Sequence, residues 1–262
     1  MKVACIQLNS GSDRAANLAA VAEYLQRAAD AGAELALLPE NFASMGGSDA
    51  EKRCMAAEAD ALLDFLAAQA ATHHLHIIGG SLLIAREQGI TNSLPVFDNR
   101  GALLACYDKM HLFDMDLNGE RYAESDLIAA GEQPVIVELA GFRIGLSICY
   151  DLRFPELYRH YSAAGCDLLC NVAAFTATTG RAHWRTLLTA RAIENQCYML
   201  AAAQCGEHPD GRHTWGQSMV IDPWGEVIGK QGDGAGVVIA SISCSRLRAI
   251  RQQLPALRHR RM

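Results

Sequence analysis

The sequence predicts an α/β fold in which helices cover the outer faces of two mixed sheets. Short apolar runs rich in β-branched residues alternate with longer stretches whose apolar residues recur at helical spacing. Several neighbouring runs are joined by turns too short for a crossover helix, so those strands must pair antiparallel. Of the 262 residues 50% are hydrophobic, enough for a large core. Hairpins within a strand–helix alternation exclude a simple βα barrel and favour a layered sandwich, with residues 1–262 as one domain.

The first half of the chain contains two helical signals. Asp13 is a suitable N-cap for a helix that continues to about Ala31, and Gly32 ends it. A second amphipathic helix is expected over residues 50–72. Strands are expected at residues 2–8, 35–38, 76–84, 93–97 and 102–107. The continuous apolar run 35–38 is typical of a central strand covered on both faces.

The second half begins with a long polar segment, residues 108–133, of the kind that compact domains often use for function. The runs 135–139 and 142–148 then predict a hairpin, and Pro155 favours the start of a helix. Helices are expected at residues 156–164, 181–195 and 245–254. Strands are expected at residues 167–172, 198–203, 217–221, 226–230 and 236–242, and a polar loop at 206–212.

Composition and charge exclude several classes of protein. The net charge is −6 and the basic residues are scattered, so we expect no nucleic-acid surface, and residues 258–261 are interpreted as a solvated end. The nine cysteines occur singly, which argues against a disulfide framework and a zinc site, and we expect no metal and no other cofactor. No apolar run is long enough to cross a bilayer, and the chain starts as a strand without a signal peptide. A cytoplasmic protein that binds no membrane is expected.

Three expected strands end close to residues that can perform chemistry, namely Glu40, Lys109 and Cys149. The carboxyl ends of strands are where α/β sheets bind ligands, so the three side chains can share a pocket. A carboxylate beside a thiol can accept its proton, and an ammonium group can stabilise a thiolate or an oxyanion. Each residue also has a plainer interpretation, because cysteines are often core residues and Glu–Lys pairs commonly lie on the surface.

Three motifs resemble the signatures of the nitrilase, or carbon–nitrogen hydrolase, superfamily. They are Leu38-Pro-Glu40, Asp108-Lys109-Met-His-Leu-Phe113 and Gly145-Leu-Ser-Ile-Cys149-Tyr-Asp-Leu-Arg-Phe-Pro-Glu156, in the order of the family. The resemblance implies a four-layer αββα sandwich and a metal-free Glu–Lys–Cys triad that hydrolyses a carbon–nitrogen bond. It implies that Cys149 is the nucleophile, that Glu40 is the general base, and that Lys109 supports the tetrahedral intermediate.

The resemblance also implies two further contributors to the reaction. The backbone N–H of Tyr150 would complete the oxyanion hole together with Lys109. A second glutamate of the family corresponds to Glu124, in Tyr122-Ala-Glu124-Ser125, and would orient Lys109 and the thiol. Glu120 is the competing residue for this role.

Segments further along the chain resemble the amidase branch of the superfamily. Residues 178–184 and 191–198 are similar to the branch that comprises deaminated-glutathione amidases and ω-amidases, and residues 201–206 and 222–225 are closer to the former. The resemblance implies an amidase that hydrolyses deaminated glutathione to α-ketoglutarate and Cys-Gly through a thioester on Cys149. The alternative is an ω-amidase that releases ammonia from α-ketoglutaramate or a related small ω-amide.

Substrate contacts are expected from five residues at or after the nucleophile: Tyr150, Arg153, Phe175, Thr176 and Arg181. The guanidinium of Arg153 suits a substrate carboxylate, although an ion pair with Asp151 or Glu156 is an equal alternative. Arg181 stands where these amidases commonly have proline, at an expected helix start. Either arginine can hold the substrate carboxylate.

Two further alternatives concern the chemistry, and one prediction concerns assembly. His111 or His183 could act as the base of a Cys–His hydrolase in place of Glu40. A catalytically silent scaffold on the same fold would require the loss of a triad residue, and all three are present. The resemblance implies a homodimer that pairs through the helices at 156–164 and 181–195.

Overall fold

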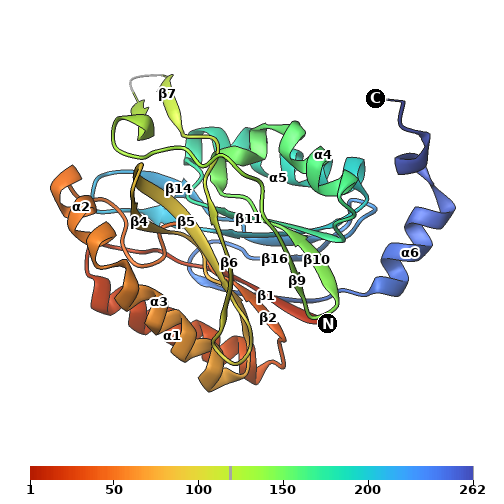
Figure 1. Ribbon diagram of the computed structural model, residues 1–262, viewed down its shortest axis with the longest axis horizontal. Coiled ribbons are helices and arrows are strands. Elements are labelled where there is room, and N and C mark those ends of the chain that lie inside the picture. The colour runs from red at the N-terminus through yellow and green to blue at the C-terminus, as the bar shows by residue number, and fades with distance from the viewer. Residues whose placement is uncertain (118–119, 262) are drawn as a thin grey trace.

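The computed structural model, which describes residues 1–117 and 120–261, is built on two large mixed sheets (Figure 1). The first sheet contains β1 (Lys2–Gln7), β2 (Leu35–Leu37), β3 (His76–Ile78), β4 (Leu82–Arg86), β5 (Gly89–Phe97), β6 (Leu103–Asp108) and β17 (Gly236–Ser241). Within it β1, β2 and β3 are parallel. Antiparallel pairing adds β17 beside β1, and β5 with β4 and β6 beside β3.

The second sheet is organised in the same way, around a parallel centre. Its strands, in spatial order, are β16 (Val227–Lys230), β15 (Met219–Ile221), β12 (Tyr198–Ala203), β11 (Leu168–Ala173), β10 (Phe142–Gly145) and β9 (Ile136–Leu139). The strands β10, β11 and β12 are parallel, and the hairpins β9–β10 and β15–β16 are antiparallel. The parallel strands of both sheets therefore bring several carboxyl ends to one edge.

Helices cover the outer faces of both sheets (Figure 1). They are α1 (Arg14–Asp30), α2 (Asp49–Ala57) and α3 (Ala59–His73) on the first sheet, α4 (Pro155–Ala163) and α5 (Ala177–Asn195) on the second, and α6 (Cys244–Gln253) near the C-terminus. Strand β1 shows the layering, because Val3 and Cys5 belong to the core between the sheets, whereas Ala4 and Ile6 pack with residues of α1 and α3. The αββα sandwich expected from the sequence is confirmed.

Two predictions in the first half of the chain were wrong in detail. The single helix expected over 50–72 is two helices, which meet at Glu58. The single strand expected over 76–84 is broken at Gly79-Gly80, where the chain leaves β3 and returns as β4. Gly80 has a φ of +66°, and a Cβ at this position would lie 2.2 Å from the carbonyl oxygen of Pro39. This turn therefore packs directly on the segment that precedes Glu40, which only glycine permits.

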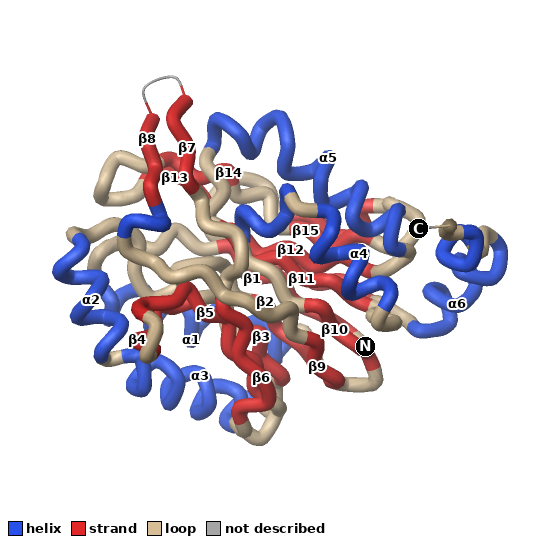
Figure 2. Tube along the Cα trace, turned by 45° about the horizontal axis from the view of Figure 1, so that its top comes forward, coloured by secondary structure: helices blue, strands red, loops and turns tan. Residues whose placement is uncertain are grey.

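The polar segments contain more structure than the sequence predicted. Residues 108–133 include the hairpin β7 (Asp114–Leu117) and β8 (Glu120–Ala123), followed by the 3-10 turn η1 (Glu124–Asp126). The loop expected at 206–212 lies between β13 (Cys205–Glu207) and β14 (His213–Trp215), which pair with each other. The two hairpins lie side by side beyond the ends of the main sheets (Figure 2). Short strands with polar sequences give little periodic signal, which is why they were missed.

Candidate active site

Glu40, Lys109 and Cys149 converge on a single cavity, although they are far apart in the sequence. Glu40 follows β2, Lys109 follows β6, and Cys149 begins the 3-10 turn η2 (Cys149–Arg153) after Ile148 has bridged to Val172 in β11. The cavity has a volume of about 320 Å³. Neighbouring strand ends therefore bring the three predicted residues together.

Glu40 is almost completely buried, and protein groups hold both of its carboxylate oxygens. Oε1 accepts hydrogen bonds from Asn92 Nδ2 at 3.0 Å and Lys109 Nζ at 3.1 Å. Oε2 accepts a hydrogen bond from the backbone N–H of Ala174 at 2.7 Å. The backbone carbonyl of Glu40 accepts a hydrogen bond from Gln204 Nε2 at 3.0 Å. The carboxylate is therefore fixed from both sheets, as a precisely placed base requires.

Lys109 lies between two carboxylates. Its Nζ is 3.1 Å from Glu40 Oε1, and it is 3.0 Å and 2.8 Å from the two oxygens of Glu124. Burial by itself would lower the pKa of this lysine, but the charges of Glu124 and Glu40 raise it well above the usual value. Lys109 is therefore a fixed positive charge beside the cavity.

Cys149 has an unusual backbone conformation and is a buried residue that lines the cavity. Its φ is +45°, a left-handed value that a non-glycine residue adopts only when the surrounding structure imposes it. The backbone carbonyl accepts a hydrogen bond from Asn171 Nδ2 at 3.5 Å. Burial and the charge of the adjacent Glu40 raise the pKa of the thiol well above its usual value, although Lys109 opposes this shift. The resting side chain is therefore a neutral thiol within reach of a base.

Glu124 opens the turn η1, and both of its carboxylate oxygens accept hydrogen bonds from Lys109. Its Oε2 also accepts the backbone N–H of Phe113 at 2.7 Å. Glu120, the competing residue, lies in β8, and its side chain is outside the described part of the structure.

Asn92 is a site residue that sequence reasoning missed. Its Nδ2 donates to Oε1 of Glu40 at 3.0 Å and to Oε1 of Glu124 at 3.3 Å. Its Oδ1 is buried and has no hydrogen-bond partner. The expected strand began at residue 93, but β5 starts at Gly89, and its residues Thr91, Asn92 and Ser93 are all buried. A run of polar residues leading into an apolar strand was the available signal.

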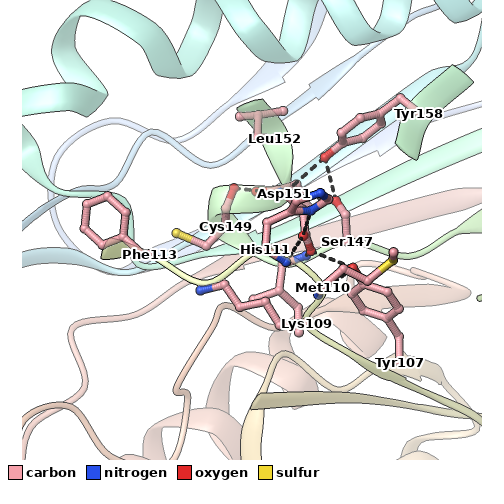
Figure 3. Close-up of polar contacts among 12 residues, drawn as sticks. Tyr107, Lys109, Met110, His111, Phe113, Ser147, Cys149, Asp151, Leu152 and Tyr158 are labelled. Carbon is pink, nitrogen blue, oxygen red and sulfur yellow. Dashed lines mark hydrogen bonds and ion pairs between the residues drawn. The ribbon is translucent and has the colours of Figure 1, made fainter. Parts of the chain in front are cut away.

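Asp151 connects the turn of Cys149 with the segment of Lys109 (Figure 3). Its Oδ1 accepts from the backbone N–H and from Nδ1 of His111, at 3.0 Å and 2.7 Å. Its Oδ2 accepts from the hydroxyl of Tyr107 at 2.8 Å and from the backbone N–H of Ile148 at 2.9 Å. In Figure 3 the sulfur of Cys149 and the ammonium group of Lys109 point to the same side, away from Asp151. Asp151 therefore links the segments that carry Lys109 and Cys149, on the side opposite to their reactive groups.

Neither histidine considered as a rival base contacts Cys149 in the described contacts. His111 hydrogen-bonds to Asp151, and its ring stacks on Phe154 with the centroids 3.7 Å apart. His183 Nδ1 lies 3.1 Å from Nη1 of Arg153. The structure therefore favours Glu40 over His111 or His183 as the group next to the thiol.

Of the five residues predicted to contact the substrate, four lie beside Cys149 and one does not. Tyr150, Arg153, Phe175 and Thr176 line a small recess of about 10 Å³ beside Cys149. Arg153 lies over the rings of Tyr150 and Phe175, at 5.6 Å and 5.0 Å from their centroids, and no ion pair joins it to Asp151 or Glu156 among the described residues. Arg181 lies over the ring of Trp215, 5.9 Å from its centroid, and lines neither the cavity nor the recess.

Within residues 1–117 and 120–261, no group of three or more His, Cys, Asp or Glu side chains is arranged to hold a metal ion. No helix in the same ranges has the length and apolar character needed to cross a membrane. The described chemistry of the site consists of carboxylates, an ammonium group and a thiol.

The chain matches known proteins over nearly its whole length. Residues 2–252 match the family model described as carbon–nitrogen hydrolase. The chain is 43% identical to a deaminated glutathione amidase of Synechocystis sp., over 98% of this chain and 97% of that one. It is 36% identical to an omega-amidase of Danio rerio, over 99% and 94% of the two chains.

Two solved structures are also similar. The NitFhit protein of C. elegans has a TM-score of 0.92 and 36% identity over 99% of this chain, which spans 65% of that longer protein. A mutant amidase of Nesterenkonia sp. AN1, which carries the product of acrylamide addition at its active-site cysteine, has a TM-score of 0.82 and 27% identity over 97% of this chain and 98% of that one.

Proposed function

The chain belongs to the carbon–nitrogen hydrolase family and is an enzyme of that family, and on this premise we propose that Glu40, Lys109 and Cys149 form the catalytic triad of an amidase. The observation that carries the proposal is the convergence of a buried carboxylate, a buried ammonium group and a thiol on one cavity. The pKa values of Lys109 and Cys149 are both raised well above their usual values, and groups with shifted pKa values cluster at active sites.

The first half of the reaction follows from these contacts. Glu40 accepts the proton of the Cys149 thiol, and the sulfur attacks the amide carbon. The oxyanion of the tetrahedral intermediate is stabilised by Lys109 and by the backbone N–H of Tyr150. Glu40 then returns the proton to the leaving amine, which leaves a thioester on Cys149.

The second half uses the same groups on water. Glu40 accepts a proton from a water molecule, whose oxygen attacks the thioester carbon. The carbon–sulfur bond then breaks, the acid is released, and Glu40 returns the proton to the Cys149 sulfur. Glu124 holds Lys109 in place through both steps, and Asn92 and Asp151 position the carboxylate and the nucleophile. Because the thiol is neutral at rest, the thiolate forms only as Glu40 accepts its proton.

The favoured substrate is deaminated glutathione, cleaved to α-ketoglutarate and Cys-Gly. This proposal is supported by the similarity to proteins named deaminated glutathione amidase, at 43% and 39% identity over nearly the full chain. The second candidate is a small ω-amide such as α-ketoglutaramate, which is supported by the omega-amidase of Danio rerio at 36% identity.

A substrate panel distinguishes these two activities. The purified enzyme is given deaminated glutathione, α-ketoglutaramate, a simple amide, a nitrile and an N-carbamoyl amino acid, and the products are quantified by chromatography. We expect the highest kcat/KM for deaminated glutathione. A higher value for α-ketoglutaramate would establish the alternative, and a preference for the nitrile would contradict both.

The triad itself is tested by two substitutions. Replacing Cys149 with Ala should abolish amide hydrolysis, and unchanged hydrolysis would sink the mechanism. Replacing Glu40 with Gln should remove most of the activity, whereas near-normal rates would favour a histidine base.

We also propose a homodimer that pairs through α4 and α5, in a cytoplasmic location. Near these helices Ile193 and Trp224 expose 50% and 54% of their surfaces, which supports a covered interface. The nine cysteines are all unpaired, as is usual in a reducing compartment. A single sedimenting species with the mass of the monomer would contradict the dimer.

A further inference from the structure

The main cavity extends from Cys149 to the loop between β13 and β14 and to the β7–β8 hairpin. Arg212 from this loop and Tyr122 from β8 both line it, and the guanidinium carbon of Arg212 lies 4.9 Å from the centroid of the Tyr122 ring. Two segments that are distant in the sequence thus meet at the cavity, and Figure 2 shows their two hairpins side by side. The contact places a cation in the same enclosed space as the nucleophile.

Arg212 sits on a tightly held turn. Its backbone carbonyl accepts a hydrogen bond from His208 N at 2.9 Å, and its backbone N–H donates to Asp210 Oδ1 at 3.1 Å. The buried His208 ring in turn contacts Ser10 O at 2.9 Å and Thr214 Oγ1 at 2.7 Å. The arginine is therefore attached to rigid backbone and is held ready for a ligand.

The guanidinium has donors that the described protein does not satisfy. Nε of Arg212 is buried and has no hydrogen-bond partner. Among the described residues its ion pair is with Asp210 Oδ2, at 3.8 Å, which is longer than a hydrogen bond. The side chain is 30% exposed. A planar group with free donors at a cavity wall matches the two oxygens of a carboxylate.

Among the charged residues that line the cavity apart from the triad, Arg212 is the cation best placed to bind an anionic group of a ligand. Lys52 is paired with Asp49 at 3.5 Å, and both line the cavity. Arg121 of β8 also lines the cavity, but it is an exposed residue, so solvent and salt screen its charge more than that of Arg212. Asp126 and Asp210 also line the cavity, and Asp210 competes with any anion for the guanidinium.

Arg153, one of the two arginines that the sequence offers for the substrate carboxylate, is placed differently. It lies at the recess of about 10 Å³, which is too small for an acyl chain, and its guanidinium is already engaged by His183 and two aromatic rings. The space beside the triad that can hold a substrate of several carbon atoms is on the side of Arg212.

We propose that Arg212 binds a carboxylate of the substrate and selects anionic amides over neutral ones. This inference rests on the proposed amidase function, and it names the residue that recognises the charge. It assigns to Arg212 the role that the sequence left to Arg153 or Arg181. Asp210 and Tyr122 hold the guanidinium in place until the ligand carboxylate arrives.

The test measures binding to the protein with Cys149→Ala, so that no probe is consumed. The probes are glutaramate, which has a carboxylate at the end of its acyl chain, pentanamide, which lacks it, and N-pentanoylglycine, which has the carboxylate on the amine side. Arg212→Met should weaken the binding of one of the two anionic probes by about 10- to 100-fold, as expected for the loss of hydrogen bonds between ions. The binding of pentanamide should be unchanged. Arg212→Lys should give an intermediate loss, because it keeps the charge without the fork.

The matched control is Arg248→Met, which removes an exposed arginine of α6. The anionic probe whose binding is weakened by Arg212→Met shows whether Arg212 recognises a carboxylate on the acyl side or on the amine side of the amide. The proposal would be overturned if Arg212→Met reduced the affinity for glutaramate, N-pentanoylglycine and pentanamide equally, or for none of them. It would also be overturned if only Arg153→Met removed the preference for anionic probes. Because binding is measured without turnover, these results do not depend on whether deaminated glutathione is the substrate.

Discussion

Glu40 and Asp151 are both buried carboxylates at the same site, but their surroundings differ. Asp151 is completely buried and accepts four hydrogen bonds, from Tyr107, from the backbone of Ile148 and twice from His111. Glu40 accepts from Asn92, Lys109 and Ala174, and it also lines the cavity beside the Cys149 thiol.

The difference explains why two similar side chains have different roles. Each oxygen of Asp151 is occupied by two donors, so a proton transfer would break existing hydrogen bonds. Asp151 also keeps Tyr107 protonated, because burial and the charge of Asp151 raise the pKa of that phenol well above its usual value. Glu40 retains contact with a thiol whose proton it can accept. Glu40 is therefore suited to catalysis and Asp151 to positioning.

The strongest test of this comparison is Glu40→Gln. It keeps the shape of the side chain and removes the base, so kcat should fall by about 10²- to 10⁴-fold while the protein remains folded. Steady-state kinetics on deaminated glutathione and circular dichroism provide the measurements. A loss of folded structure equal to that of Asp151→Asn would contradict the division of roles.

Asp151→Asn should mainly affect stability. An amide has one acceptor oxygen, so buried donors from Tyr107, His111 or Ile148 lose their partner, at a cost of about 1–3 kcal/mol in the free energy of unfolding. Chemical denaturation measures this loss. If the variant is as stable as the wild type but has lost activity as completely as Glu40→Gln, then Asp151 acts in the chemistry itself.

Asn92→Ala should have a smaller effect, on activity. It removes the amide that bridges Glu40 and Glu124, but Lys109 still contacts both carboxylates, so we expect about a tenfold loss in kcat/KM. Ser93→Ala removes a buried hydroxyl of the same strand and is the matched control. Equal losses in the two variants would show a general disturbance of β5.

The smallest expected effect is on the reactivity of the thiol. Burial raises the pKa of Cys149 most, and the negative charge of Glu40 raises it further, because a second negative charge nearby is unfavourable. Glu40→Gln removes the second cause, so the pKa should fall and alkylation by iodoacetamide should begin at lower pH. Asp151→Asn should leave the pH profile in place. A shift to higher pH in Glu40→Gln would mean that Glu40 does not face the thiol.

Residues with a strong local signal were predictable from the sequence. Asp13 caps α1 as predicted, because its Oδ1 accepts the backbone N–H of Ala16 at 3.1 Å. Strand β12 has the predicted bounds, because its continuous apolar run fits a buried parallel strand. Helix α5 begins at Ala177, four residues before the predicted start, because Thr176 forms its N-cap. Local side-chain chemistry determined these elements.

The sequence also determined which groups are available for chemistry, since the motifs around Glu40, Lys109 and Cys149 contain the family signature. The meeting of these residues, the bridging amide of Asn92 and the occupied oxygens of Asp151 depend on strand ends from two sheets, which no local pattern encodes. The position of Arg212 was decided in the same way, by a turn held by His208 that brings the side chain to the cavity. The sequence determines which side chains carry charge or can react, whereas the neighbours that set their reactivity and their roles come from packing between distant segments.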